Sequence, residues 1–572
     1  MISASYGEHS IAIGAAIARA RTGDLMRRIR DQDHTVWKPE ADEISNRLGW
    51  LRAPGRMKKE IGRMARFAEE TGSRTSAVLL LGMGGSSLAP EAFAEIFGAG
   101  DAGATRLRVI DTTDPDHIAA IAASTDPLRT LHIVATKSGT TIETLSAFRF
   151  FHRRVVQALD ARGRDEAGAG DGDAGARFAA ITDPGSPLAQ VARDLCFSEI
   201  FLNPPDVGGR YSALTFFGLV PAALVGADVE ALLERAEAVM RASLAGEDGR
   251  ALGLGVALGV LAENGRDKLT LSTSPEIEPL ADWVEQLVAE STGKGGKGIV
   301  PVVREPLGAP GVYGADRVFV DLTLADDGER ADALADLERA GHPVIWLGLR
   351  DLHDVGGQIA LWELATAIAG AQLAVNPFDQ PDVEAAKARA RAAAQAYAET
   401  GALPESPAAP LEASALADFL GVPPRGAYVG LQAYVTPSAD AAGALRALRL
   451  AIRDRYRVAT TAGYGPRYLH STGQLHKGGG GGGIFVQLTS EARADLVIPA
   501  PETAPGPAEE PDAPREETRR PLTFGALKAA QAVGDREALE AAGRRVIRFD
   551  VGADAPAGIE TLAEGLSRLE DG

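Results

Sequence analysis

The sequence predicts an α/β protein with two doubly wound parallel-sheet domains in tandem and a helical C-terminal region. Short apolar runs without polar alternation recur between residues 77 and 202 and again between residues 268 and 349. Longer stretches separate these runs, and several are rich in Ala and Leu, as helices are. Strands that are apolar on both faces and alternate with helices are typical of a parallel sheet covered on each side.

The apolar runs are the expected strands. The first domain should contain AVLLL (77–81), RLRVI (106–110), LHIVA (131–135), FAAI (178–181) and EIFL (199–202). The second should contain KLTLS (268–272), IVPVV (299–303), VFVDL (318–322) and VIWLGL (344–349).

The chain of 572 residues is long enough for about two to four packed units. We expect an N-terminal helical segment (1–58), a first domain (59–245), a second domain (246–377), a helical region (378–490), a Pro/Glu-rich linker (491–521) and a C-terminal helix and strand (522–572). The stretch ARGRDEAGAGDGDAGAR should be a flexible insertion within the first domain.

The composition excludes several classes of function. The formal charge of −19 at pH 7 disfavours nucleic-acid and anionic-membrane partners, because both repel an acidic protein. No run approaches the about 18 apolar residues that span a membrane. The one cysteine, Cys196, excludes an internal disulfide framework and suggests a reducing compartment, so we expect a cytoplasmic protein. Its apolar neighbours in DLCFSEIF predict a buried side chain rather than a nucleophile.

The stretch TKSGTTIET is the clearest sign of a binding site. It follows an expected strand, and ligands of open parallel sheets bind at the carboxyl ends of strands. Ser138, Thr140 and Thr141 supply hydroxyl donors, and Lys137 supplies a positive charge. A phosphate monoester, a dianion that needs several short donors, fits this set. The alternative is a Ser/Thr-rich helix cap, which would use only one or two of the hydroxyls.

A second glycine-rich turn, GMGGSSLAP, follows the first expected strand. Gly82 and Gly84 begin a dinucleotide-binding fingerprint, and Asp111 ends the next strand, where an acid could bind a ribose. However, Ser87 stands where the third glycine is required, and the interval from Gly82 to Asp111 exceeds the ~20 residues expected. The sequence therefore favours a small sugar phosphate over a nicotinamide cofactor and predicts no cofactor.

Two further stretches supply candidate catalytic groups. Arg210 follows two glycines at the start of an expected helix, where it can point at an anion. Glu290 lies at the edge of an apolar helix face that contains Trp283, directly before a glycine-rich helix end. Apolar surroundings favour the uptake of a proton by a carboxylate, which suits a general base. A solvated glutamate at a helix end is the alternative.

The stretch YGPRYLHSTGQLHKGGGGGG places His470, Gln474 and Lys477 on one helical face. Its two histidines are six residues apart and have no further ligand-type spacing, so they do not predict a metal site. The six glycines predict a mobile loop.

Together these blocks resemble the glucose-6-phosphate isomerase family, which is built from two sugar-isomerase domains. The resemblance rests on GMGGSSLAP, TKSGTTIET, VGGRYS, AESTGKGG and the lysine that ends a C-terminal helix, and it covers most of residues 60–490. Three longer stretches, DHTVWKPEADEISNRLGWL, LWELATAIAGAQLAVNPFDQP and GPRYLHSTGQLHKGG, look like the isomerase half of bifunctional transaldolase/glucose-6-phosphate isomerase proteins.

The resemblance implies interconversion of glucose 6-phosphate and fructose 6-phosphate through a cis-enediol, without metal or nucleotide. Glu290 would carry the proton between C2 and C1, Arg210 would stabilise the enediolate, and Lys477 would act at the ring oxygen. The substrate would be held by Lys137, Ser138, Thr140 and Thr141 at its phosphate, and also by Gly85, Ser86 and Gln358.

One position departs from the family motif Asn-Gly-Gln-His, whose histidine assists ring opening from the partner subunit of a dimer. In VGGQIALWE, Ile359 stands at that histidine position. Ring opening should then depend on Lys477, helped by His470 or His476, and one subunit should suffice for catalysis. The resemblance leaves room for a homodimer.

Three alternatives remain open at this point. A sugar-phosphate sensor would keep the phosphate loop without the catalytic groups, and an NAD-dependent oxidoreductase would need the missing fingerprint glycine. An isomerase that also accepts mannose 6-phosphate is the third, because both hexoses pass through the same enediol.

Overall fold

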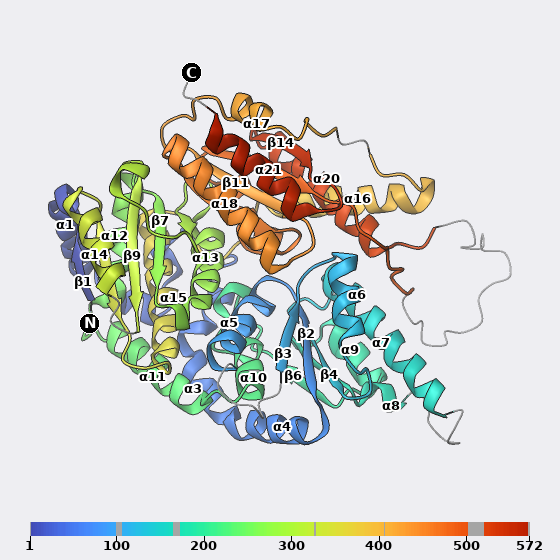
Figure 1. Ribbon diagram of the computed structural model, residues 1–572. Helices are drawn as coiled ribbons and strands as arrows, with labels where there is room; N and C mark the ends of the chain where they lie inside the picture. Colours follow the sequence, from blue (N-terminus) through green and yellow to red (C-terminus); the bar gives the residue numbers. More distant parts are fainter. Residues whose placement is uncertain are drawn as a thin grey trace.

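The computed structural model describes residues 2–98, 106–163, 172–324, 328–404, 407–500 and 520–569 (Figure 1). In this part of the chain, helices cover three largely parallel sheets. The α/β class and the two tandem parallel-sheet domains are confirmed. The third sheet lies mostly where we expected helices.

The first sheet contains all five apolar runs predicted for it. Its strands are β2 (Ala77–Gly82), β3 (Arg106–Ile110), β4 (Thr130–Ala135), β5 (Phe178–Thr182) and β6 (Glu199–Leu202). The order is β3-β2-β4-β5-β6, and all neighbours are parallel. The winding direction therefore changes between β2 and β4, and the carboxyl ends of these strands flank the crevice where such sheets bind ligands.

The second sheet has the same winding. Its parallel strands are β7 (Lys268–Thr273), β8 (Val300–Val302), β9 (Arg317–Thr323) and β10 (Val344–Gly348), in the order β10-β9-β7-β8. The N-terminal strand β1 (Ile2–Ser5) adds to this sheet, antiparallel to β10. The prediction of a wholly helical N-terminal segment is thus wrong. A strand of four residues is too short to show a strand period in the sequence.

The third sheet corrects the prediction of a helical region over residues 378–490. Its strands are β11 (Tyr428–Tyr434), β12 (Ala459–Tyr464), β13 (Gly483–Thr489) and β14 (Arg545–Asp550), all parallel, in the order β12-β11-β13-β14. Sequences such as YVGLQAY and ATTAGY contain glycine, alanine and hydroxyl side chains instead of long apolar runs, although every residue of β11 is buried. The periodicity therefore could not reveal them.

Helices pack around these sheets and begin with side-chain caps at several places, such as Asp114, Ser186 and Thr523. They include α5 (Leu88–Phe97), α7 (Ile142–Gly163), α13 (Pro279–Thr292), α15 (Asp354–Gln372), α16 (Glu384–Thr400), α19 (Gly473–Gly478) and α20 (Phe524–Ala541). The others are α1 (Ser10–Thr22), α2 (Leu25–Arg30), α3 (Ala53–Met57), α4 (Ile61–Arg74), α6 (Pro115–Ala123), α8 (Gly172–Gly175), α9 (Pro187–Asp194), α10 (Phe216–Leu224), α11 (Val229–Leu244), α12 (Arg250–Glu263), α14 (Gly328–Arg339), α17 (Ala413–Leu420), α18 (Ala439–Tyr456) and α21 (Ala555–Arg568). None of the described helices has the length and apolar character needed to cross a membrane.

The first two sheets share one apolar core. A single cluster of buried side chains includes Leu80 of β2 and Leu271 of β7, together with Trp50, Trp283 and Trp362. Each of the three indoles is at most 1% exposed, and full burial of a large apolar side chain contributes about 1.5–3 kcal/mol. This shared core fixes the two domains relative to each other, so side chains from both can meet in one site.

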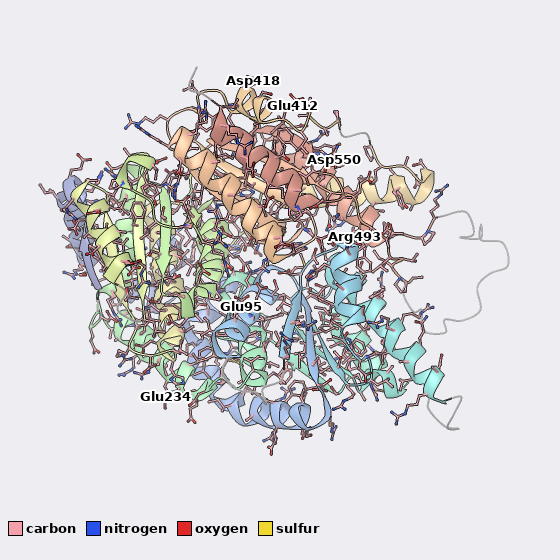
Figure 2. All side chains as sticks on the ribbon, viewed as in Figure 1. Glu95, Glu234, Glu412, Asp418, Arg493 and Asp550 are labelled. Carbon is pink, nitrogen blue, oxygen red and sulfur yellow. The ribbon has the colours of Figure 1, made fainter. Side chains whose placement is uncertain are left out.

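The chain after β13 returns to the first domain. The backbone N–H of Arg493, labelled in Figure 2, donates to Asp116 of α6 over 2.9 Å. The predicted helix and strand near the C-terminus are α20 and β14, which α21 follows. Residues 501–519 of the predicted linker and residues 164–171 of the predicted insertion lie outside the described residues.

Cys196 is exposed, so the prediction of a buried side chain is wrong. It follows the end of α9 in the left-handed region, with φ 55°, and the chain turns there before the buried Phe197. This turn leaves Cys196 at the surface between the half-buried Leu195 and the buried Phe197.

Candidate functional site

A cavity of about 410 Å³ lies at the carboxyl ends of β2 and β4, where the winding of the first sheet changes direction. An adjoining cavity of about 160 Å³ shares Ser138, Thr141, Lys387 and His470 with it and extends to Lys477. Ten of the residues predicted for the site line one or both cavities: Gly85, Ser86, Lys137, Ser138, Thr140, Thr141, Arg210, Glu290, His470 and Lys477. The fold thus brings together residues from loops and helices that connect the strands of all three sheets.

The hydroxyl cluster of TKSGTTIET lies between β4 and α7. The hydroxyl groups of Thr136 and Thr141 are hydrogen-bonded over 2.8 Å, as are those of Ser138 and Thr140. Ser138 and Thr140 are exposed to the cavity side, so their hydroxyls remain accessible to a ligand. A set of short donors is therefore preorganised at one end of the site.

Lys137 has a partner that the sequence did not suggest. Its ammonium forms an ion pair with Asp183 and donates to the carbonyl of Pro205 over 3.1 Å. Burial raises the pKa of the Asp183 carboxyl, and Lys137 opposes this effect. The charge of Lys137 is therefore partly compensated within the protein before any ligand binds.

Two cations on α16 also line the smaller cavity, and sequence analysis missed both. Lys387 and Arg391 are one helical turn apart and line this cavity together with Ser138, Thr140 and Thr141. Lys387 lines the larger cavity too. The spacing of the two cations in EAAKARARA was visible in the sequence, but nothing there indicated that this helix lies over the hydroxyl cluster.

Two glycines allow the turn GMGGSS, which follows β2, to approach the rest of the site closely. A Cβ on Gly85 would lie 2.2 Å from the carbonyl oxygen of Gly209, directly before Arg210. Gly84 has a φ of 54°, and its Cβ would lie 2.4 Å from the carbonyl oxygen of His470. The glycines of GMGGSS are therefore needed for packing against the other parts of the site.

Glu290 and Arg210 form the buried centre of the larger cavity. Oε1 of Glu290 lies 3.2 Å from Nη1 of Arg210, and their side chains are 7% and 2% exposed. Nε2 of Gln286 donates to Oε2 of Glu290 over 3.1 Å and to the carbonyl of His470 over 2.9 Å. Glu290 thus lies on the buried face of α13, as predicted, but its carboxylate is paired with Arg210 rather than surrounded by apolar atoms alone.

Backbone groups hold Arg210 on its other side. Its guanidinium donates to the carbonyls of Pro377 and Asp379, over 2.6 Å and 3.0 Å, and to the hydroxyl of Ser291 over 2.9 Å. Nearby, Lys294 donates to Asp379 over 2.8 Å. Burial, followed by the charge of Arg210, lowers the pKa of Lys294 to about 8.

His470 is paired with a carboxylate. Its Nε2 lies 3.0 Å from Oε1 of Glu143, and the amide of Gln531 donates to the same oxygen over 2.6 Å. Burial raises the pKa of Glu143, but the charge and hydrogen bond of His470 outweigh this effect and leave that pKa below its ordinary value. Glu143 lies within TKSGTTIET, yet only its contact with His470, 327 residues away, shows its place in the site.

Lys477 lies in the last turn of the short helix α19, and its side chain is 4% exposed. Its ammonium donates to Oδ1 of Asp535 over 2.5 Å and to the carbonyl of Gly473 over 3.4 Å. Gln474 was predicted on the same face, but its amide binds Asp382 and Gly293 instead of lining a cavity.

His476 does not reach the site. Its ring packs 4.9 Å from the ring of Phe485, and burial lowers its pKa well below the ordinary value. The idea that it assists ring opening is therefore wrong, because its side chain points into the core beside the third sheet. His470 is the histidine of this stretch that lines the cavities.

Gln358 and Ile359 lie on α15, within the shared core. Gln358 is 4% exposed, and its amide oxygen has no hydrogen-bond partner among the described residues. It lines neither of the two cavities described above. Within the described ranges, no group of three or more His, Cys, Asp or Glu side chains is arranged to hold a metal ion.

Comparison with known proteins gives consistent matches. A family model described as phosphoglucose isomerase matches residues 51–300. A protein named glucose-6-phosphate isomerase from Rubrobacter xylanophilus is 32% identical over 409 residues, which are 61% of this chain and 92% of the relative. One of the same name from Streptococcus pneumoniae is 28% identical, over 60% of this chain and 86% of the relative.

Solved structures share the fold. A hypothetical protein from Thermus thermophilus superposes with a TM-score of 0.55 at 25% identity, over 68% of this chain and 99% of the other. A glucose-6-phosphate isomerase from Chlamydia trachomatis superposes with a TM-score of 0.56 at 18% identity, over 71% of this chain and 89% of the other.

Proposed function

This chain belongs to the phosphoglucose isomerase family, and we propose that it interconverts glucose 6-phosphate and fructose 6-phosphate in the cavity at the carboxyl ends of β2 and β4. The observation that carries this assignment of the site is the buried pair of Glu290 and Arg210, 3.2 Å apart, in the same cavity as a cluster of hydroxyl groups. An aldose–ketose isomerase needs these parts: a base, a cation for the developing oxyanion and a phosphate anchor.

The substrate phosphate would lie at the hydroxyl cluster. Ser138, Thr140 and Thr141 supply short donors there, and Lys387 and Arg391 supply positive charge from α16, which lines the same cavity. Charge-assisted hydrogen bonds to a dianion are the stronger kind. With the phosphate in this place, the sugar carbons would extend past Gly85 and Ser86 toward Glu290.

Glu290 would move the proton in the chemical step. Its carboxylate removes the proton from C2 of the open-chain aldose, the electron pair forms the C1–C2 double bond, and O1 becomes an oxyanion. The O2 hydroxyl proton then moves to O1, which leaves the enediolate charge on O2. As the C2–O2 carbonyl forms, C1 accepts the proton back from the same carboxyl group. Arg210 would stabilise the charge on the enediolate oxygens, because it lies beside the base and is held rigidly.

Ring opening needs a proton at the ring oxygen and a group that accepts the proton of the O1 hydroxyl. Lys477 would donate at the ring oxygen, and His470, oriented by Glu143, would accept the second proton. A neutral imidazole that a carboxylate holds in place can accept such a proton. All of these side chains come from one chain, which supports a self-sufficient subunit within any homodimer.

A coupled assay tests the proposal directly. The purified protein, given fructose 6-phosphate alone, should form glucose 6-phosphate, which an NADP-dependent dehydrogenase reports. Binding without turnover would instead indicate a sensor, and bound nicotinamide in the ultraviolet spectrum would indicate an oxidoreductase. Mannose 6-phosphate in the same assay tests the wider substrate range. The single cysteine supports our further proposal that the enzyme is cytoplasmic.

The variant Glu290→Gln should lose turnover by about 10²–10⁴-fold and keep its affinity for the sugar phosphate, because the carboxylate acts mainly in proton transfer. Glu276→Gln, which removes an exposed carboxylate just before the same helix, is the matched control and should remain active. Activity of Glu290→Gln above a tenth of wild type would contradict the assignment.

A further inference from the structure

The C-terminal helix α20 carries a row of buried polar side chains. Lys528, Gln531 and Asp535 follow a spacing of three and four residues and are 5%, 2% and 1% exposed. Helix faces that serve only for packing are apolar, because a buried polar group is costly unless it is paired. Figure 1 shows α20 beside α16, above the first domain and far in sequence from the matched residues 51–300.

Gln531 and Asp535 bind residues that line the smaller cavity, Glu143 and Lys477, and Lys528 binds Asp114 beside the first sheet. Lys528 donates to Asp114, which follows β3, over 2.9 Å. Gln531 donates to Glu143 over 2.6 Å and accepts from the hydroxyl of Thr113 over 2.8 Å. The carboxylate of Asp535 accepts from Lys477.

We propose that α20 is a positioning element of the active site, in which Asp535 holds the ammonium of Lys477 and Gln531 holds the Glu143–His470 pair. This inference rests on the proposed function, where Lys477 and His470 open the sugar ring. The sequence blocks that resemble the family lie N-terminal to residue 490, so this helix lies outside them.

The surroundings of Asp535 fit a positioning role. Its second carboxylate oxygen accepts from the hydroxyl of Tyr468 over 2.7 Å, and that hydroxyl lies 3.1 Å from the hydroxyl of Tyr434. The carboxylate is therefore fixed from two sides and is fully buried. A lysine side chain is long and flexible, so a fixed carboxylate at its end determines where the ammonium lies.

A double-mutant cycle in the full-length protein tests the proposal. Asp535→Asn should lower kcat by about 10-fold or more and change KM less than about twofold, because the phosphate anchor is elsewhere. Lys477→Met should lower kcat further, and the double variant should be no slower than Lys477→Met alone. Glu540→Gln, which removes an exposed carboxylate from the same helix, is the control and should match wild type.

The outcomes separate the two proposals. Two results would overturn the role of Asp535 and leave the proposed function intact. One is a folded Asp535→Asn with wild-type kcat. The other is a double variant whose kcat falls by the fold-change of Asp535→Asn multiplied by that of Lys477→Met. If Lys477→Met keeps wild-type kcat, the assigned role of Lys477 in the proposed function is what fails. Asp535→Asn leaves an unpaired buried ammonium and could prevent folding. In that case Asp535→Glu, which keeps the charge but displaces it, should fold with reduced kcat, and an unchanged kcat would overturn the proposal.

Discussion

Thr140 and Thr141 show how single hydroxyls in this site are expected to contribute to binding. Both line the smaller cavity, and Thr141 is oriented by its bond to Thr136. Replacing both by Val should raise KM strongly and spare the fold, because each hydroxyl donor to a charged partner contributes about 1.5–3 kcal/mol. Steady-state kinetics with fructose 6-phosphate measures the change. An unchanged KM would place the phosphate elsewhere and favour the helix-cap interpretation.

His132 gives a residue-scale prediction about pH. It lies on β4, stacks on Phe178 at 4.7 Å, and burial lowers its pKa to about 3 from an ordinary 6.5. Because the unfolded state binds the extra proton between these values, the native state loses stability as the pH falls below 6.5. At pH 5 this loss is about 2 kcal/mol.

His132→Phe should remove that part of the pH dependence. The free energy of unfolding of wild type minus that of the variant should fall between pH 7 and pH 5, as measured by urea unfolding at several pH values. A difference that stays constant over this range would show that His132 is not a buried neutral group.

At the scale of elements, α16 is expected to bind the phosphate through its charge. Lys387→Met should raise KM with little effect on kcat, because Lys387 lines the smaller cavity together with the hydroxyl cluster, whereas Glu290 lines only the larger cavity. Arg389→Met is the matched control, since Arg389 is on the same helix but lies 3.9 Å from Glu537 of α20. Equal changes in KM for both variants would mean that α16 acts only through its general charge.

The elements that the sequence could predict are those whose signal is local. The strands of the first two sheets are unbroken apolar runs, and the turns that carry Ser86, Thr140 and Arg210 are contiguous motifs. The third sheet has no such runs, since its strands contain small and polar residues that only tertiary packing buries.

Partners across the chain could not be predicted in this way. Asp535 reaches Lys477 across 58 residues, and Gln531 reaches Glu143 across 388. Neither interval has a fixed spacing in sequence, because each depends on how two separately formed elements dock. The same holds for Lys387. The sequence predicted its helix, but not that this helix lies beside the hydroxyl cluster.

For the whole molecule, the question is whether one chain is sufficient. Ile359 is 1% exposed in a single chain, in the core between the helices that pack on α15, so it is not available to a partner's site. We therefore predict that specific activity stays constant on dilution into the monomeric range, with light scattering to establish when monomers dominate. A loss of activity that follows dissociation, while the monomer stays folded, would show that a partner residue is needed.

The measurement that tests the central claim most directly is the fate of the hydrogen at C2. The enzyme should convert glucose 6-phosphate labelled with deuterium at C2 into fructose 6-phosphate that carries part of the label at C1. The rest should be lost to water, because Glu290 holds the proton in an exchangeable carboxyl group between the two carbons. Mass spectrometry of the product at low conversion measures both fractions, and Glu290→Gln should abolish both transfer and loss. Complete transfer of the label without any loss to water, or transfer that persists in Glu290→Gln, would contradict a proton carried by Glu290.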